Sequence, residues 1–165
     1  MFKKILNHYA YTAIFGIEDS LVSTVGLLSG IAIAGIERKT IILTGVILIF
    51  VEAISMSAGS FLSEVSAEEI KNNKYNAVKH SAKHGILMFF SYFVAGFIPL
   101  FPYVIKQISN PLIISIFLSL FTLFILGAIA AKISNLGILK RGLRMFIVGG
   151  IAIGIGVLIG IFFNF

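Results

Sequence analysis

The sequence contains no cysteine and few charged residues. Of its 165 residues, 12% are charged and 58% are hydrophobic, whereas soluble domains have about a quarter charged residues. The absence of cysteine excludes disulfides, Fe–S clusters and thiolate metal sites, so any metal ion must be bound by oxygen, histidine nitrogen or methionine sulfur. The mean hydropathy is +1.04. These values predict an integral membrane protein.

Five apolar stretches are each long enough to cross the hydrocarbon core of a bilayer, which takes about 20 helical residues. They comprise residues 9–36, 40–63, 85–105, 111–131 and 142–163. The connections are short, so consecutive helices should be antiparallel neighbours. We therefore expect an all-α integral membrane protein with five transmembrane helices in a single domain, residues 1–165. A short cytoplasmic segment, residues 64–84, should join the second and third helices.

Basic residues are divided unequally between the two sides of this arrangement. The side of the N-terminus has ten: Lys3, Lys4, Lys71, Lys74, Lys79, Lys83, Lys132, Lys140, Arg141 and Arg144. The other side has three: Arg38, Lys39 and Lys106. The positive-inside rule then predicts a cytoplasmic N-terminus and a C-terminus outside. The net charge of +6 is thus interpreted as a signal of orientation, and no nucleic-acid partner is expected.

Acidic residues are absent from the last three spans but occur inside the first two, as Glu18, Asp19 and Glu52. A carboxylate near the middle of a bilayer costs about 2.5 to 3.5 kcal/mol on the lenient insertion scale, which points to a functional role. The helical rise places Asp19 and Glu52 about 15 to 17 Å from the cytoplasmic boundary. The two acids should meet at one level near the midplane, whereas Glu18 points about 100° away from Asp19.

Each of the two acid-bearing spans has one distinctive face. In the first span, one face carries Asp19, Ser23, Gly26 and Gly30, and the Gly-x-x-x-Gly pair is typical of closely packed membrane helices. In the second span, one face carries Glu52, Met56, Gly59 or Ser60, and Ser63. This second face runs from the middle of the membrane toward the cytoplasm, so it is a candidate lining for an ion path.

The residue types on these faces favour particular metal ions. Carboxylate oxygens suit hard cations, and a thioether shifts the preference toward softer or borderline ions. Asp19 and Glu52, with Met56 one turn away, would therefore suit Fe²⁺ or Mn²⁺ better than Mg²⁺, although a lone methionine is more often packing than ligand. Carboxyl groups in apolar surroundings favour the protonated form, so an arriving cation would displace protons. Exchange of metal for protons is the resulting hypothesis.

The segment 64–84 is the only sizeable polar region. Glu64, Glu68 and Glu69 open it and are expected to collect ions at the mouth of the path, with an ordinary acidic helix extension as the alternative. The second helix should continue into this region and be followed by a short basic amphipathic piece. For that basic half, which includes His80 and His84, a headgroup-binding surface is favoured over metal binding.

Four blocks of sequence resemble the vacuolar iron transporter (VIT) family, and together they cover nearly the whole chain. They are FGIEDSLVSTVGLLSGIA, AISMSAGSFLSEVSAEE, SYFVAGFIPLFPY and LKRGLRMFIVGGIA. The resemblance implies a five-helix homodimer that moves Fe²⁺, and in some members Mn²⁺, out of the cytosol in exchange for protons. It also implies an ion path between the first and second helices of the two protomers, with Asp19 and Met56 matching residues of the family pattern.

The chain departs from that pattern in three places. The family's Asp-Gly in the first helix is Asp19-Ser20 here, preceded by the additional acid Glu18. The family's second-helix Glu falls on Leu48, and Glu52, four residues later, is its expected substitute. The large Glu-rich cytoplasmic domain of eukaryotic members is reduced to about twenty residues, which suggests a short prokaryotic-type member.

The sequence therefore predicts a transporter rather than an enzyme, with no cofactor and with divalent metal and protons as its substrates. The metal should meet the side chains of Asp19, Glu52, Met56, Glu18, Glu64, Glu68 and Glu69. The expected protein is a homodimer through its first helix in a prokaryotic plasma membrane. The alternative is a small dimeric membrane scaffold whose intramembrane acids only pair helices. Export of a small organic cation is a further option, disfavoured because so small a bundle offers little pocket volume.

Overall fold

The computed structural model is a bundle of five α-helices. It describes residues 2–72, 78–134 and 136–164, with side chains for residues 8–70, 78, 80–134 and 136–164. The helices are α1 (Phe2–Ile33), α2 (Arg38–Asn72), α3 (Val78–Val104), α4 (Pro111–Ile133) and α5 (Ile138–Phe162). Within these ranges there is no strand, and all five helices are long and apolar enough to cross a membrane.

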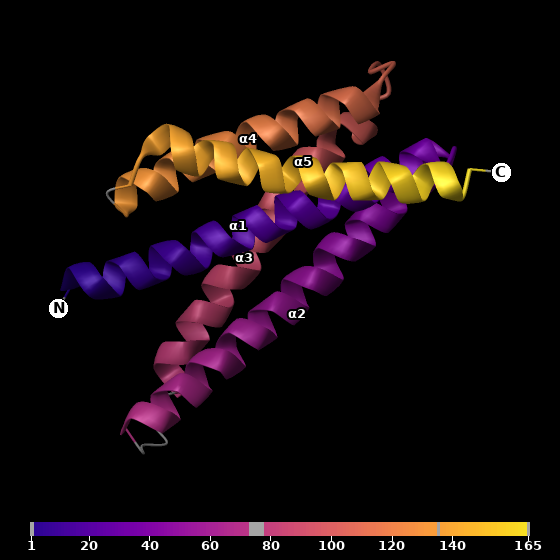
Figure 1. Cartoon of the computed structure of the whole chain (residues 1–165). Helices are drawn as coiled ribbons and strands as arrows, with labels where there is room; N and C mark the ends of the chain where they lie inside the picture. The colour runs from indigo at the N-terminus through magenta and orange to yellow at the C-terminus, as the bar shows by residue number, and fades with distance from the viewer. Residues whose placement is uncertain (1, 73–77, 135, 165) are drawn as a thin grey trace.

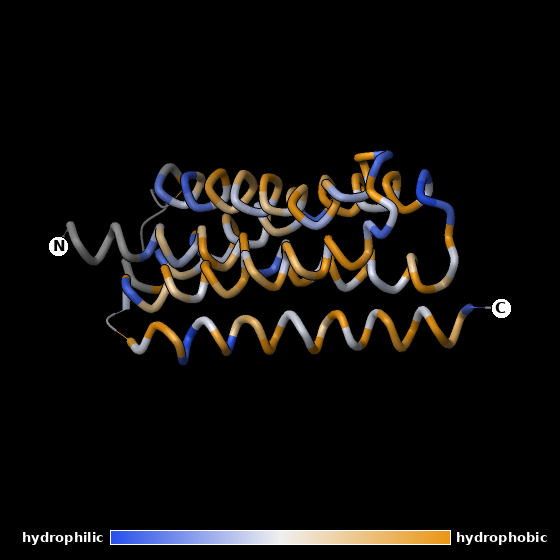
Figure 2. The backbone as a smooth tube through the Cα atoms, turned by 90° about the horizontal axis from the view of Figure 1, so that it is seen from above, coloured by the Kyte–Doolittle hydropathy of each residue, from blue (hydrophilic) through white to orange (hydrophobic). Residues whose placement is uncertain are grey.

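The helices lie side by side with alternating direction, and the two termini lie at opposite ends of the bundle (Figure 1). Hydrophobic residues run along the middle of every helix, and hydrophilic ones gather toward the two ends (Figure 2). Large apolar side chains on the outer faces of all five helices are exposed. The architecture is thus that of an all-α membrane protein with five spans, as the sequence predicts.

The first helix ends three residues earlier than the sequence suggests, because Gly35 adopts a left-handed conformation with φ of 77°. The amide of Ile36 donates to the carbonyl of Ile31 at 3.2 Å, and the amide of Gly35 donates to the carbonyl of Ala32 at 3.2 Å. This pair of bonds is the Schellman motif, which closes a helix with a glycine. The turn into α2 is therefore compact and fixed in length.

The second and third helices extend well beyond the apolar stretches. Helix α2 continues to Asn72 and carries all three acids of the segment 64–84, as expected for a continuing helix. The described part of the basic half forms the first turns of α3 rather than a separate piece. Residues 73–77 and the side chains of Lys3, Lys4, Lys71 and Lys79 lie outside what the structure describes.

The end of α3 is capped by an arginine from the start of α2. A helix leaves its last carbonyl groups without partners, and Pro99 and Pro102 lack an amide hydrogen. The Arg38 guanidinium donates to the carbonyls of Tyr103 at 2.6 Å, Pro102 at 3.2 Å and Ile108 at 3.3 Å, and also to that of Ile105. One side chain therefore closes α3 and ties it to α2.

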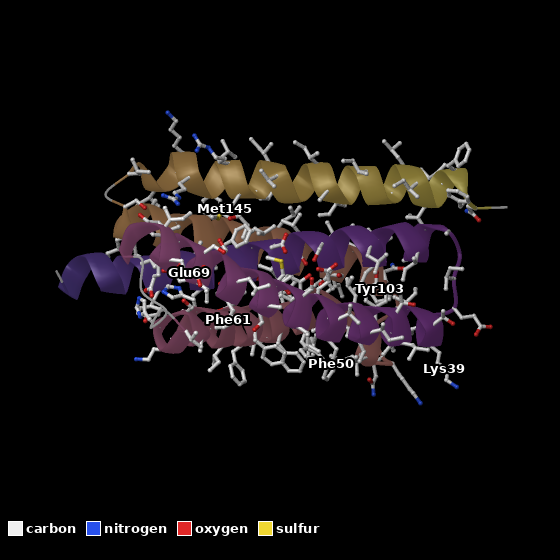
Figure 3. The ribbon with its side chains drawn as sticks, turned by 90° about the horizontal axis from the view of Figure 1, so that it is seen from below. Lys39, Phe50, Phe61, Glu69, Tyr103 and Met145 are labelled. Carbon is white, nitrogen blue, oxygen red and sulfur yellow. The ribbon has the colours of Figure 1, made fainter. Side chains whose placement is uncertain are left out.

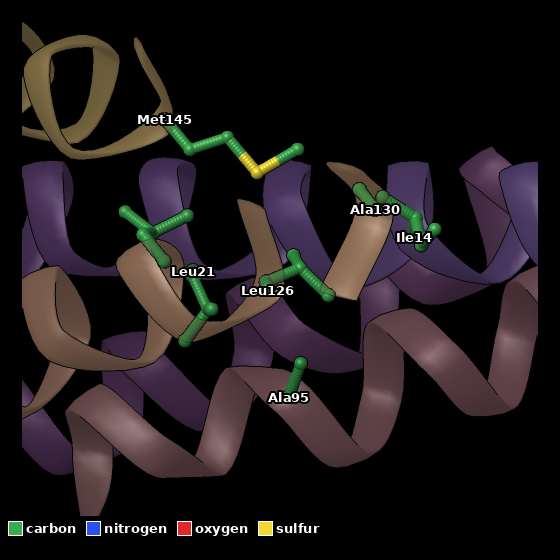
Figure 4. Packing of buried hydrophobic residues seen from close by; sticks show 7 residues of the cluster. Ile14, Leu21, Ala95, Leu126, Ala130 and Met145 are labelled. Atoms are coloured by element: carbon green, nitrogen blue, oxygen red, sulfur yellow. The ribbon is translucent and has the colours of Figure 1, made fainter. Parts of the chain in front are cut away.

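Helix α1 is the centre of the bundle, since it contacts each of the other four helices, whereas α2 contacts only α3 and α1. The main core cluster gathers around α1 and joins it to α3, α4 and α5 (Figure 4). Its buried members are Ile14, Leu21, Ala95, Leu123, Leu126, Ala130 and Met145. The position of α1 is thus fixed by contacts on several sides, whereas α2 and α5 each contact two helices among the described residues.

The glycines of α1 pack against glycines of α5 in the same chain. A β-carbon added at Gly30 would lie 2.8 Å from the carbonyl oxygen of Gly156, and one at Gly26 would lie 3.3 Å from that of Ala152. From the other side, β-carbons at Gly156 and Gly160 would collide with the carbonyl oxygens of Gly26 and Gly30. The Gly-x-x-x-Gly pair of the first span therefore holds two helices of one protomer together.

Replacing Gly156 by Ala is expected to destabilise the protein by about 1 to 3 kcal/mol, because the new methyl group meets backbone that cannot move aside. Gly154→Ala is the matched control, since no heavy atom lies within 4 Å of a β-carbon built there. Thermal unfolding in detergent should show a lowered Tm for Gly156→Ala alone. Equal Tm values for the two variants would mean that α1 and α5 are not in backbone contact.

Candidate metal centre

The three acids of the membrane spans do not share one site. Asp19 on α1 and Glu52 on α2 are half-buried and close enough for their carboxylates to repel one another. Glu18 is turned toward α5, where its strongest interaction with another charged group is attraction by the Arg141 guanidinium. The structure therefore brings Asp19 and Glu52 to one level of the bundle. Glu18 lies on the other side of α1, where the positive charge of Arg141 attracts its carboxylate.

Two hydroxyl contacts with α3 position the helix turn that carries Asp19. Buried Ser20 donates to the backbone carbonyl of Tyr92 at 2.6 Å, and Ser23 is hydrogen-bonded to the Tyr92 hydroxyl at 2.6 Å. The Tyr92 hydroxyl also experiences the charges of Asp19 and Glu52. Ser20 thus helps to hold α1 against α3 beside the acidic pair.

Neither Asp19 nor Glu52 has a hydrogen-bond or ion-pair partner in the part of the chain that the structure describes. An acidic side chain whose only role is to pair helices would be expected to form a hydrogen bond with a neighbouring helix. Two carboxylates that repel each other, with no cationic side chain paired to them among the described residues, leave their negative charge uncompensated. Their oxygen atoms are of the type that hard cations prefer as ligands.

A row of side chains at three- or four-residue spacing leads away from this pair on each of three helices. On α2 the row is Glu52, Met56, Ser60 and Glu64; on α3 it is Tyr92, Met88, His84 and His80; on α1 it is Asp19, Phe15, Thr12 and His8. Positions three or four apart lie on one face of a helix. Such a row spans about 16 to 18 Å of helix, so the rows extend from the middle of the bundle to the end where α2 and α3 are joined.

The three rows meet in a groove between α1, α2 and α3. Its volume is about 410 Å³, and its lining includes the thioethers of Met56 and Met88, the imidazoles of His8 and His84, and the Glu64 carboxylate. Half-buried Met56 therefore faces the same space as the groups at the end of the bundle. The groove combines sulfur, nitrogen and oxygen atoms that are able to bind a divalent ion.

Histidines and glutamates gather at the far end of this groove. His8, Glu64 and His84 each offer one ligand atom, and these atoms lie within 4.8 Å of one another. Glu64, Glu68 and His80 form a second such group. Glu69, labelled on α2 in Figure 3, is exposed and belongs to neither group. It follows Glu64 by five residues, a spacing that places the two on different sides of a helix.

Four residues of this region were missing from the predicted ion path: His8, His84, Met88 and Tyr92. The signal that would have found three of them is the four-residue spacing from His80 to Tyr92, which repeats the spacing from Glu52 to Glu64 on α2. For His8, no feature of the sequence indicated that it meets Glu64, which lies 56 positions away.

Comparison with known families matches residues 11–81 and 68–161 to the VIT family. The match covers nearly the entire chain. The chain belongs to the VIT family. No curated protein matches it closely enough to be reported as a relative. Membership makes this VIT protein a multi-pass membrane protein, and it indicates a membrane transporter of metal ions.

The hydrogen bond between Ser23 and Tyr92 can be measured by a double-mutant cycle with Ser23→Ala and Tyr92→Phe. Such bonds between membrane helices contribute about 0.6 kcal/mol on average and up to about 1.7 kcal/mol, and we expect a coupling energy in this range from unfolding free energies. The control cycle is Tyr11→Phe with Ser134→Ala, an exposed bond of 3.0 Å for which coupling should be smaller. No coupling in the first cycle would contradict the described contact.

Proposed function

We propose that this VIT protein exports Fe²⁺, and also Mn²⁺, from the cytosol in exchange for protons, as a homodimer in a prokaryotic plasma membrane. Its N-terminus would then be cytoplasmic and its C-terminus outside, in accordance with the distribution of basic residues. The observation that carries the proposal is the pair of Asp19 and Glu52, which repel each other across α1 and α2 without any compensating partner among the described residues.

The proposed ion route follows the groove. An ion would arrive at the end of the bundle that carries Glu64 and Glu68, pass the thioethers of Met56 and Met88, and reach the carboxylates of Asp19 and Glu52. Ligand softness supports Fe²⁺ and Mn²⁺ over Mg²⁺, because thioether and imidazole groups favour borderline ions. Glu69 would contribute only to the local negative charge at the mouth.

Proton exchange follows from the same pair of acids. Two carboxyl groups in apolar surroundings favour the protonated form when no ion is present, and a divalent ion binds only the ionised form. Arrival of the ion would therefore release protons, and departure of the ion outside would allow protons to bind again. An imposed pH gradient should change the rate of metal flux.

The scaffold function receives less support. It requires Asp19 and Glu52 to join helices, yet the bonds that tie α1 to α3 at this level come from Ser20 and Ser23 instead. A scaffold would also show no saturable effect of Fe²⁺ on its thermal stability. A transporter with an ion site should be stabilised by the ion it binds, in proportion to the logarithm of ion concentration above Kd.

Asp19→Asn is expected to abolish metal transport and to leave the protein folded, because it removes a charge but keeps the shape of the side chain. The measurement is Fe²⁺ uptake into proteoliposomes under an imposed pH gradient, with thermal unfolding as the test of folding. Glu37→Gln is the matched control, since Glu37 lies in the exposed turn between α1 and α2 and should transport like the wild type. Retained flux in Asp19→Asn would refute the assigned role of Asp19.

The dimer is proposed to form along the part of α1 that α5 leaves uncovered. An apolar groove of about 700 Å³ runs between α1 and α5, with Val22, Leu27 and Ile31 in its lining. Helix α2 has no contact with α5, so the groove opens toward the surface beside α2. Apolar side chains and small residues along this face suit close packing with a second protomer.

Because the chain has no cysteine, single cysteines can report this interface. Leu27→Cys should form a disulfide-linked dimer in native membranes, since paired α-carbons at a two-fold axis can approach within the roughly 7 Å that a disulfide requires. Phe117→Cys, on the outer face of α4 with 69% exposure, should remain monomeric on non-reducing gels. Cross-linking of Phe117→Cys alone would place the interface on α4.

A further inference from the structure

We propose that His8, Glu64 and His84 form a divalent-metal site, in which two imidazoles and one carboxylate bind a borderline transition-metal ion at the end of the bundle that joins α2 to α3. The three residues come from α1, α2 and α3, and their ligand atoms lie within 4.8 Å of one another. Nε2 of His8 is 3.2 Å from Oε2 of Glu64. Binding does not depend on transport, but the role of this site in loading the ion path rests on the proposed function.

The decisive residue is His84, whose ring is buried with 1% exposure. Its Nδ1 lies 3.0 Å from the Thr12 hydroxyl oxygen, and that hydroxyl donates its hydrogen to the carbonyl of His8 at 3.2 Å. A hydroxyl has one hydrogen to donate, so when the Thr12 hydrogen lies on the His8 carbonyl, the neutral His84 ring donates its own hydrogen from Nδ1 to Thr12. This arrangement leaves a lone pair on Nε2.

That lone pair has no hydrogen-bond partner among the described residues, and Nε2 is shielded from solvent. Buried polar atoms are nearly always paired, so an unpaired nitrogen on a histidine that lies in one group with a carboxylate and a second imidazole is available as a metal ligand. Histidine ligands are typically fixed by a hydrogen bond from the other ring nitrogen, which is the role of Thr12 here. The Tyr9 ring, stacked on His84 at 4.4 Å and 15°, fixes the plane of the imidazole.

Two imidazoles and one carboxylate are the ligand set of non-haem Fe²⁺ sites, which keep open coordination positions. Mg²⁺ and Ca²⁺ prefer oxygen ligands and would bind more weakly. Glu64 is also a member of the group with Glu68 and His80, where Nε2 of His80 lies 3.8 Å from Oε1 of Glu68. A carboxylate shared by two groups offers an ion a continuous set of ligands along the groove.

An ion pair between His8 and Glu64 is the competing interpretation of this end of the bundle. His8 is half-exposed, with 54% of its side chain accessible, and exposed ion pairs are common without any metal. That interpretation accounts for the 3.2 Å contact but not for the buried unpaired nitrogen of His84. The two interpretations differ in whether the imidazoles bind a transition-metal ion.

The experiment is calorimetric and optical titration of the purified full-length protein in detergent with Co²⁺, whose visible absorption reports its ligands. The chain has no cysteine, so every band arises from nitrogen, oxygen or methionine ligands. Wild type should bind Co²⁺ in the presence of excess Mg²⁺. His8→Gln and His84→Gln should each weaken binding at least about 10-fold, and Thr12→Val should weaken it about 10- to 100-fold because the hydrogen bond to His84 is lost.

Lys83→Gln is the control, an exposed change adjacent to His84 that should leave Co²⁺ affinity unchanged. The His8→Gln variant should fold normally, because the His8 side chain is half-exposed. A loss of Co²⁺ binding in this variant therefore reports the loss of a ligand and not misfolding. Equal Co²⁺ affinity in wild type, His8→Gln and His84→Gln, or competition by Mg²⁺ at similar concentration, would overturn the proposal.

Parallel flux assays separate this proposal from the transport function. Histidine-dependent Co²⁺ binding in a wild-type protein without metal flux would preserve the site and refute transport. If the protein transports metal but His8→Gln and His84→Gln leave its Co²⁺ affinity unchanged, the proposed site would be refuted and the transport function would remain supported.

Discussion

Backbone contact between α1 and α5 is the constraint on which the rest of the bundle depends. Gly26 and Gly30 meet Gly156 and Gly160 without intervening side chains, so one side of α1 is fixed against the same chain. Lipid provides no hydrophobic force between helices, and close packing of small residues is what remains to hold them together. With that side fixed, the remaining faces of α1 carry Asp19 toward α2 and Ser20 toward α3.

The groove between α1, α2 and α3 changes its chemistry along its length. Nitrogen and carboxylate groups occupy the end near Glu64, and the thioethers of Met56 and Met88 follow. The Asp19 and Glu52 carboxylates and the Tyr92 hydroxyl lie beyond the lining of the groove, toward the middle of the bundle. On the proposed ion route, each stretch would offer ligands of a different strength to the same ion. Binding sites that succeed one another without one dominating are what conduction through a membrane protein requires.

Much of this arrangement could be predicted from the sequence, because an apolar stretch of about 20 residues crosses lipid as an α-helix, in which every backbone polar group is hydrogen-bonded. Five helices and an acidic pair at one level follow from length and helical rise alone. The partner of the Gly26 and Gly30 face could not be predicted, since a small-residue motif indicates close approach but not which helix approaches. His8 was missed for a similar reason: it comes together with Glu64 and His84 only through the packing of three helices.

The position of Arg38 makes the turn before it part of the structure of α3. The guanidinium reaches carbonyls 64 and 65 positions along the chain, and α3 has no other described side chain at that end to replace it. One residue inserted between Gly35 and Arg38 would lengthen the turn that brings Arg38 to these carbonyls. Lysine would not substitute, because a single ammonium cannot present the planar array of donors that several carbonyls share. A change in the short connection between α1 and α2 would therefore alter the end of α3 as well.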